Sequence, residues 1–422
     1  MILAGRLLVE AAPGVAALRE GALRIEGDTI VELLDARAAA DVLAHAARHR
    51  STDVLGGPDW LITPGFTDAH VHLPQFDSIG RSGLTLLDWL AGAVFPAEAR
   101  WADSAFARHM SRRVAHQLIA FGTVGVGAYA TVHHDATREA MRALADAGLR
   151  GIVGQVLMDR EAPLALTRPA AQLLDEAASL APVGRLRPAV TPRFAIACTP
   201  ALLEGAGRLA QETGWSIQTH LAETLPECRR VAELFAGSTY LDVYARAGLL
   251  RPGAIFAHAI HLADADRRAL AGANAVVAHC PTANAFLRSG DMDLAAHLAA
   301  GVTCALGSDI AGGYERSMVR VARHALETAA RVHPGSPAPG AAWAWWQITA
   351  GNADALAPGR LERSPAGRLA VGAPAEVLAI RPDVPWLDSP DPLSTLLYAW
   401  DDRWLQRVGV AGRWLDLAAR PC

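Results

Sequence analysis

The chain has 422 residues, 51% hydrophobic and 19% charged, which is enough for one large domain with a full core and a smaller partner domain. Its formal net charge of −4 provides no basic surface, so we expect neither nucleic acid nor an anionic membrane as a partner. All 39 basic residues are arginine, and the lack of lysine excludes mechanisms that need a Schiff-base lysine, a P-loop lysine or a carboxylated lysine bridging two metals.

The chain shows no sign of a disulfide framework or a membrane segment. Its cysteines are odd in number and far apart, with no CxxC pair, which favours a reducing compartment. The amino terminus lacks a charged region followed by a long apolar core, and no apolar run reaches membrane length. We therefore expect a soluble, cytoplasmic protein.

Both ends of the chain predict short β-strands. Residues 1–60 hold alternating apolar segments around Gly27 and Asp28, followed by a helical stretch from Arg37 to Arg50. Similar β signals return at 375–380 and 408–415. We predict a small β domain built from both termini, residues 1–60 and 366–422, flanking a catalytic domain of residues 61–365.

The middle of the chain alternates short apolar runs with helical stretches, which is the pattern of repeated βα units. Eight such units over roughly 250 residues match the size of a (β/α)8 TIM barrel, an α/β fold. The predicted strands are Leu61–Thr67, Thr123–Ala130, Gly151–Met158, Leu186–Val190, Trp215–Thr219, Ala254–Ala257, Ala275–Ala278 and Val302–Leu306. The segment Pro334–Gly340 is predicted to be a surface loop.

Polar side chains follow these strands where a barrel would use them. Active sites of such barrels lie at the carboxyl ends of the strands, so residues far apart in sequence are expected to converge. The residues in these positions are His70, His72, Arg193, His220, Glu223, His258, His279 and Asp309. The segment Arg81–Trp101 is longer than a plain connection needs and is predicted to be a lid.

The first predicted strand leads into two histidines, His70 and His72, at positions i and i+2. Strand side chains alternate between faces, so both imidazoles point the same way. Neutral imidazole is a common ligand of zinc and neighbouring metals, and the pair forms half of a metal site. The alternative is a pair of surface or capping histidines.

Motifs across most of the chain resemble the amidohydrolase superfamily, and within it the guanine deaminases. They are PGFTDAHVHLPQF from Pro64, LLDWL and FPAE near Trp89 and Phe95, ATVHHD from Ala130, VTPRFAIAC from Val190, THLAE from Thr219, FAH from Phe256, AHCPTAN from Ala278 and GSDIAGG from Gly307. The sequence departs from the family pattern at Ser308, Ala283 and Ala373, none of which belongs to the proposed chemistry.

The resemblance implies one Zn²⁺ per subunit, held by His70, His72, His220 and Asp309, although iron suits the same ligands. Three imidazoles and a carboxylate around a divalent ion leave room for a water whose pKa falls toward neutrality. Glu223 is predicted to shuttle protons, Asp309 to accept the proton of the water, and His258 to contact the attacking water. The alternatives are a first-turn helical carboxylate for Glu223 and a core histidine for His258. His279 fits a site wall and a structural role equally.

Arg193 and Gln75 are expected to select the substrate. The planar guanidinium of Arg193 matches the O6 and N7 acceptors of guanine, and the Gln75 amide can donate and accept along the remaining edge. Phe194 and Trp89 are expected to wall in the flat ring. The alternatives are a salt bridge or phosphate clamp for Arg193 and lid packing for Trp89. The complete predicted substrate-binding set is Gln75, Trp89, Arg193, Phe194, His220, Glu223 and Asp309.

The predicted function is hydrolytic deamination of guanine to xanthine and ammonia by a metal-activated water, with Glu223 as proton shuttle. One alternative is a deaminase of another ring, such as a pterin, an oxidised purine or a triazine. Another is an inactive barrel kept as a binding scaffold. Hydrolysis of cyclic amides with a lysine-bridged metal pair is disfavoured by the lack of lysine, and the HxE and PCxxC pattern of polynucleotide deaminases is missing. The resemblance further implies a homodimer.

Overall fold

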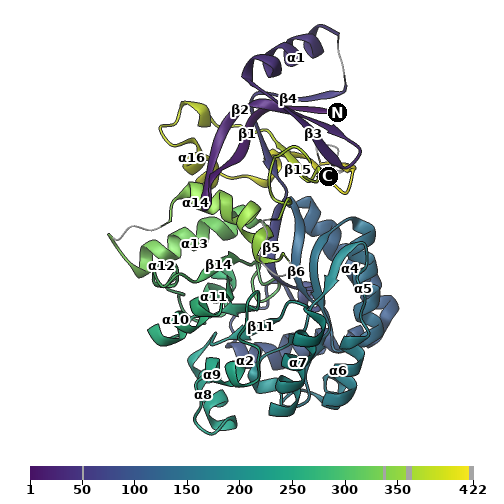
Figure 1. Ribbon diagram of the computed structural model, residues 1–422, viewed down its shortest axis with the longest axis vertical. Coiled ribbons are helices and arrows are strands. Elements are labelled where there is room, and N and C mark those ends of the chain that lie inside the picture. The colour runs from purple at the N-terminus through teal and green to yellow at the C-terminus, as the bar shows by residue number, and fades with distance from the viewer. Residues whose placement is uncertain (50–51, 336–338, 358–363, 418–422) are drawn as a thin grey trace.

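The computed structural model describes residues 1–49, 52–335, 339–357 and 364–417. It contains a mixed β-sheet made from the two ends of the chain and a barrel of parallel strands surrounded by helices (Figure 1). Arg50, residues 336–338 of the predicted loop and residues 418–422 of the predicted second half of the small domain lie outside the described residues.

The terminal sheet joins strands from both ends of the chain, as predicted. Its strands are β1 (Ile2–Ala12), β2 (Val15–Glu26), β3 (Thr29–Leu34), β4 (Val54–Pro64), β15 (Val377–Ile380), β16 (Leu405–Val410) and β17 (Arg413–Asp416). Their order is β17-β16-β15-β4-β1-β2-β3. β4 is central, parallel to β1 and antiparallel to β15. Fully buried Leu7, Leu23, Ile62 and Val377 form part of its core.

The barrel strands run parallel around a closed circuit. They are β5 (Phe66–His72), β6 (Thr123–Tyr129), β7 (Arg150–Gly154) continued by β8 (Val156–Leu157), β9 (Arg185–Pro188) continued by β10 (Thr191–Pro192), β11 (Gln218–Leu221), β12 (Ile255–His258), β13 (Val276–His279) and β14 (Thr303–Leu306). A bridge between Val190 and Ile217 joins the two halves. The His72 amide donates to the Ile310 carbonyl at 2.9 Å and closes the circuit beside β14. The predicted (β/α)8 barrel is confirmed.

The strand limits differ from the predicted ones in a consistent way. The predicted run Leu61–Thr67 is in fact two strands that meet at Gly65, because β4 belongs to the terminal sheet and β5 to the barrel. A Cβ on Gly65 would lie 2.4 Å from the Val124 side chain, so the junction needs glycine. The domain limits 1–60, 61–365 and 366–422 stay a prediction, and β4 runs across the first of them.

Helices between the strands cover the outside of the barrel (Figure 1). Good helix caps explain several of their starts, as where Thr199 accepts from the Leu202 amide and Pro200 occupies the first turn. The helices of eight or more residues are α1 (Ala36–His49), α4 (Ser104–Ala120), α5 (His134–Ala147), α6 (Ala170–Ala178), α7 (Pro200–Thr213), α8 (Leu225–Leu234), α10 (Asp264–Gly272) and α13 (Met318–Val332). The shorter ones outside the predicted lid are α9 (Tyr240–Arg246), α11 (Pro281–Phe286), α12 (Leu294–Ala299), α14 (Ala341–Trp346), α15 (Asn352–Ala355) and α16 (Pro392–Tyr398).

The predicted lid is a chain of short helical turns after β5. It follows the 3-10 helix η1 (Leu73–Ser78) and contains α2 (Leu86–Trp89), the π-helix η2 (Leu90–Val94) and α3 (Phe95–Ala99). Trp89 and Phe95 are buried beneath it. Within the described ranges, no helix is both long and apolar enough to cross a membrane.

Candidate metal centre and active site

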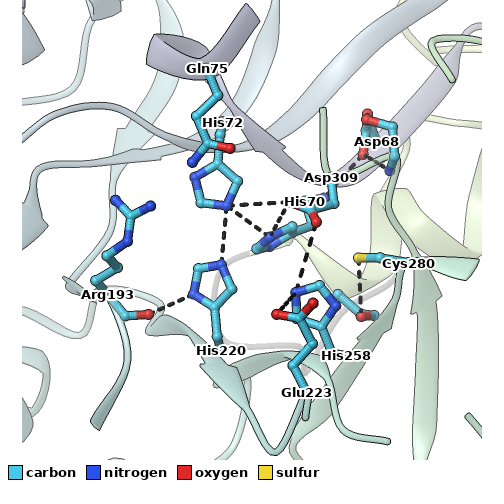
Figure 2. A network of polar contacts seen from close by, with 12 residues as sticks. Asp68, His70, His72, Gln75, Arg193, His220, Glu223, His258, Cys280 and Asp309 are labelled. Carbon is cyan, nitrogen blue, oxygen red and sulfur yellow. Dashed lines mark hydrogen bonds and ion pairs between the residues drawn. The ribbon is translucent and has the colours of Figure 1, made fainter. Parts of the chain in front are cut away.

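Three imidazoles and one carboxylate meet at the carboxyl ends of the barrel strands (Figure 2). The Nε2 atom of His72 lies 3.2 Å from that of His70 and 3.1 Å from that of His220. Oδ1 of Asp309 lies 3.3 Å from Nε2 of His70 and 3.4 Å from Nε2 of His72. The structure therefore brings all four predicted metal ligands together, although they come from three different strand ends.

The spacing and chemistry of this cluster fit a divalent metal ion. Metal–nitrogen bonds of about 2.0–2.1 Å place neighbouring ligands of a tetrahedral site roughly 3.3 Å apart, close to the separations found here. Burial lowers the pKa values of His70, His72 and His220 well below the ordinary range, and the neighbouring cations lower them further. The rings are neutral at physiological pH, so their nitrogen lone pairs are available for a metal.

Asp68, which the sequence analysis did not single out, ties the first and last strand ends together. Its Oδ1 accepts from the His70 amide at 3.1 Å and from the Ser308 amide at 3.0 Å. A Cβ on Gly307 would lie 2.6 Å from the His70 Cβ, so glycine allows the two strand ends to approach. Asp309 has a φ of 49°, a strained backbone conformation that directs its carboxylate into the cluster. The sequence feature that could have identified Asp68 is its position inside the PGFTDAH motif.

Two other site histidines are also oriented by hydrogen bonds. The His220 Nδ1 atom lies 2.6 Å from the Arg193 carbonyl oxygen, which leaves its Nε2 facing the cluster. His258 pairs through Nδ1 with Asn284 Oδ1 at 2.8 Å, and its buried Nε2 has no hydrogen-bond partner among the described residues. The sequence predicted neither the Arg193 carbonyl as the acceptor for His220 nor Asn284 as the partner of His258.

Glu223 lies at the edge of the cluster and faces His258 (Figure 2). Its Oε2 is 3.5 Å from His258 Nε2, and its Oε1 accepts from the Ser289 hydroxyl at 2.7 Å. Burial raises the pKa of Glu223 to about 8, and the negative charge of Asp309 adds to the shift. Such a carboxyl group exchanges protons near neutral pH, which is what general acid–base catalysis requires.

Arg193 is paired with Glu98, a carboxylate that stands in the FPAE motif of the sequence. Its Nη1 lies 2.7 Å from both oxygens of Glu98, and the two side chains are buried. The Gln75 amide also donates to Glu98, at 3.2 Å. The salt bridge weighed as an alternative for Arg193 therefore exists, and it places Arg193, Glu98 and Gln75 in one polar group on the lid side.

This polar group and the histidine cluster face the same pocket, which also touches Trp89, Phe194, Leu86 and Leu90. Two of its buried polar atoms, Trp89 Nε1 and Gln75 Oε1, have no hydrogen-bond partner among the described residues. A free donor and a free acceptor suit a flat polar ligand. Leu86, Trp89 and Leu90 of the predicted lid wall this pocket on one side, so opening of the lid would widen the entrance for a ring.

Three further histidines, His279, His133 and His134, do not line this pocket. His279 is fully buried, and burial lowers its pKa to about 3. Neither of its ring nitrogens has a hydrogen-bond partner in the described part of the chain, and it does not line the pocket. His133 contacts Arg168 and His134 contacts Gln155, so neither takes part in the cluster.

A (β/α)8 barrel with a buried histidine and aspartate cluster at its strand ends defines a metal-dependent hydrolase. The chain belongs to the amidohydrolase family, whose sequence model matches residues 61–415. It is 34% identical over 277 residues to the guanine deaminase of Dictyostelium discoideum, an alignment that covers 63% of this chain and 61% of that protein. The sequence alignments span less than two thirds of the length of the curated relatives first compared.

Solved structures resemble the whole chain. A crystal structure of guanine deaminase from C. acetobutylicum, with guanine bound in its active site, has a TM-score of 0.86 at 25% identity and covers 98% of this chain and 99% of that one. The E. coli guanine deaminase has a TM-score of 0.87 at 28% identity, with coverage of 98% and 99%. The similarity therefore includes the terminal sheet as well as the barrel.

Proposed function

We propose that this protein hydrolyses guanine to xanthine and ammonia. The observation that carries the proposal is one pocket lined both by His72, His220 and Asp309 of the cluster and by Arg193 and Gln75, the two partners of Glu98. Guanine has O6 and N7 acceptors along one edge and its amino group on C2. Binding of the O6 edge near Arg193 directs C2 toward the cluster. The guanine-bound relative supports the same substrate class.

We propose His70, His72, His220 and Asp309 as the ligands of one zinc ion per chain, and iron suits the same donors. When bound, this ion supplies a Lewis acid that lowers the pKa of a coordinated water. The residues contribute neutral imidazoles and a shared carboxylate, which need no deprotonation of a lysine or a thiol.

Glu223 is the proposed proton carrier. As the water oxygen bonds to C2, its proton passes to Oε2 of Glu223, which then delivers a proton to N3 of the ring. The remaining proton of the added water passes through Asp309 to the C2 amino group, so that the C2–N bond breaks, ammonia leaves and the oxygen stays on C2 as a carbonyl. Ser289 holds Oε1, so Oε2 remains on the side of the pocket and of His258. We propose that Asp309 accepts a proton from the water and that His258 contacts it.

Recognition of the ring is assigned to the lid side. The Nη1 atom of Arg193 is fixed by Glu98, and its Nε and Nη2 make no hydrogen bond with the described residues, so they can donate to O6 and N7. The free Gln75 Oε1 can accept from N1–H of guanine. Trp89 and Phe194 are placed to contact the faces of the ring.

The test is an assay of the purified, zinc-loaded protein with guanine, which follows xanthine absorbance and ammonia release. Equal amounts of both products support the proposal. Unchanged guanine together with deamination of a pterin, an oxidised purine or a triazine would overturn the substrate and keep the reaction class. A folded preparation that binds no metal and acts on none of them supports the scaffold alternative. The proposed homodimer is measured separately by light scattering.

A further inference from the structure

A second recess lies on the outside of the barrel and shares no lining residue with the active-site pocket. It measures about 500 Å³, and its walls include Arg112, Arg113 and His116 of α4, Arg316 from the loop before α13 and Phe76 of η1. No carboxylate is among the described residues that line it. Three arginines thus face one cleft in a chain whose net charge is negative.

These arginines differ from most others in the protein because two of them have no partner. Arg112 and Arg113 are exposed and form no hydrogen bond or ion pair with the described residues. By contrast, Arg108 on the same helix pairs with Glu139 at 2.5 Å. Arg316 is held in place, since its Nη1 donates to Gln117 at 2.8 Å and its guanidinium lies 4.6 Å from the centre of the Phe121 ring. The cleft therefore combines one fixed and two free cations, a pattern suited to a multivalent anion.

A second cleft of about 430 Å³ lies next to the first, and Arg112 and His116 line both. Its walls are mainly apolar, with Ile119 of α4 opposite Trp414 and Leu415 of β17. The one carboxylate among its described lining residues is Asp146, whose carbonyl oxygen accepts from Arg413. We call the two adjacent clefts the α4 trough. It has a cationic end and an aromatic end.

We propose that the α4 trough binds an organic polyphosphate that carries a flat aromatic ring, a ligand of the nucleoside triphosphate class. The phosphates lie against Arg112, Arg113 and Arg316, and the ring packs on Trp414. The trough is walled by segments that continue into the active site. Phe76 directly follows Gln75, and Arg316 lies on the loop that leads from Asp309 to α13.

Calorimetric titration of the metal-loaded protein with ATP and with inorganic tripolyphosphate tests both ends of the trough. Both ligands are expected to saturate at one per chain, and ATP is expected to bind more tightly because only ATP fills the aromatic end. The double variant Arg112→Gln/Arg113→Gln should weaken both ligands by at least about tenfold. Trp414→Leu should weaken ATP to the level of tripolyphosphate and leave tripolyphosphate unchanged. Arg108→Gln, on the same helix but outside the trough, should change neither.

Several outcomes would overturn the proposal. One is a titration of the unaltered protein that gives no saturable heat. Another is binding that the double arginine variant leaves unaltered, because the ligand then lies outside the trough. If the unaltered protein binds neither ligand and the double arginine variant changes its oligomeric state, this face is a contact between copies of the chain. If the Trp414→Leu variant does not fold, the unaltered protein still tests the aromatic end of the trough. Equal affinity of that protein for ATP and for tripolyphosphate would contradict an aromatic end. None of these results depends on activity toward guanine.

Discussion

Side chains around the cluster act mainly by fixing the atoms that do the proposed chemistry. Ser289 fixes one oxygen of Glu223, Asn284 fixes one nitrogen of His258, and the Arg193 carbonyl fixes one nitrogen of His220. Each contact leaves the second oxygen or nitrogen of the same side chain facing the pocket. Preorganisation of this kind lowers the cost of reaching a reactive geometry.

Replacing Glu223 with glutamine should remove the proton carrier and keep the shape of the site. We expect kcat for guanine to fall by about 10²–10⁴-fold, because an amide cannot exchange a proton with water or N3. Zinc content, measured by atomic absorption, should stay at that of the unaltered protein. Glu212→Gln on the exposed face of α7 is the matched control and should leave kcat unchanged. A Glu223→Gln enzyme with more than a small fraction of normal kcat would contradict the proton-carrier role.

Replacing Glu98 with glutamine should weaken guanine binding more than it slows the chemical step. The change leaves the buried guanidinium of Arg193 without its counter-charge, which typically costs about 2–5 kcal/mol. We expect KM for guanine to rise by about tenfold or more while kcat falls much less, because Glu98 positions a binding residue. Glu98→Asp should recover part of the loss. Steady-state kinetics of both variants, alone and combined with Arg193→Gln, measures the coupling energy between Glu98 and Arg193. Additive effects would show that Glu98 does not act through Arg193.

The sequence predicted most of these residues but not their partners. His70 and His72 follow from local alternation along one strand, whereas Glu98 and Arg193 are 95 positions apart and meet only across the lid. Nothing in the local pattern of FPAE distinguishes a buried partner of arginine from an exposed helical glutamate. The sequence suggested a salt bridge as an alternative role for Arg193, but it did not identify Glu98 as the partner.

At the scale of elements, α8 begins with a capping box that also supports Glu223. Thr224 accepts from the Glu227 amide, and Glu227 Oε2 accepts from the amides of Glu223 and Thr224. Burial raises the pKa of Glu227 to about 7, and the charge of Glu223 contributes. The folded protein therefore favours the protonated carboxyl, although the Tyr240 hydroxyl bonds to it at 2.6 Å.

This shift predicts a pH dependence of stability. With a raised pKa, the contribution of Glu227 is fully present below its ordinary pKa of 4.5 and is lost as the pH rises through 7. The unaltered protein should lose on the order of 3 kcal/mol relative to Glu227→Gln over this window. Urea unfolding of both metal-loaded proteins at several pH values between 4.5 and 8 measures the difference. Parallel curves would mean that Glu227 is not shifted.

The lid is expected to open for a ring to enter, because Leu86, Trp89 and Leu90 of α2 and η2 wall the pocket. Gly80 and Gly83, with φ values of 85° and 90° and open space around them, begin the segment and can act as hinges. We expect trypsin to cut after exposed Arg81, and xanthine to slow this cleavage severalfold by holding the lid closed. Mass spectrometry of the fragments measures the rate. Cleavage after Arg142 on α5 is the control, and equal slowing there would indicate global stabilisation instead.

Predicted strand positions were correct in number but displaced at the ends. The predicted Trp215–Thr219 became β11 at Gln218–Leu221, which includes His220. Apolar patterning detects residues that face the core, whereas the hydrogen-bonded ladder continues into polar residues at the mouth of the barrel. The functional residues are therefore the ones that a hydrophobic pattern leaves outside its strands.

At the scale of the whole molecule, Glu376 joins the terminal sheet to the barrel. It is 2% exposed and accepts from Arg150 of β7 at 2.6 Å and from Arg185 of β9 at 2.5 Å. Its carbonyl oxygen also accepts from the Gly65 amide, at the junction of the two bodies. One carboxylate from the C-terminal part thus pairs with two barrel arginines.

Glu376→Ala should weaken the molecule without altering the pocket. We expect the free energy of unfolding to fall by about 3 kcal/mol, because Arg150 is left buried without a counter-charge while Arg185 can still reach water. Calorimetry measures the lower melting temperature, and kcat/KM at low temperature should be nearly unchanged. Asp135→Ala breaks an exposed pair with Arg138 and should cost less than about 1 kcal/mol. Similar losses in both variants would refute the joining role.

The sequence by itself determined the order of βα units and the shared face of His70 and His72. These features depend on periodicity and chain order, which local backbone geometry dictates. Only the tertiary structure decided that Glu98 pairs with Arg193, that Glu376 joins sheet and barrel, and that α4 and β17 enclose a trough. Barrel closure sets such distances, because it brings together side chains whose separation along the chain carries no information about their separation in space.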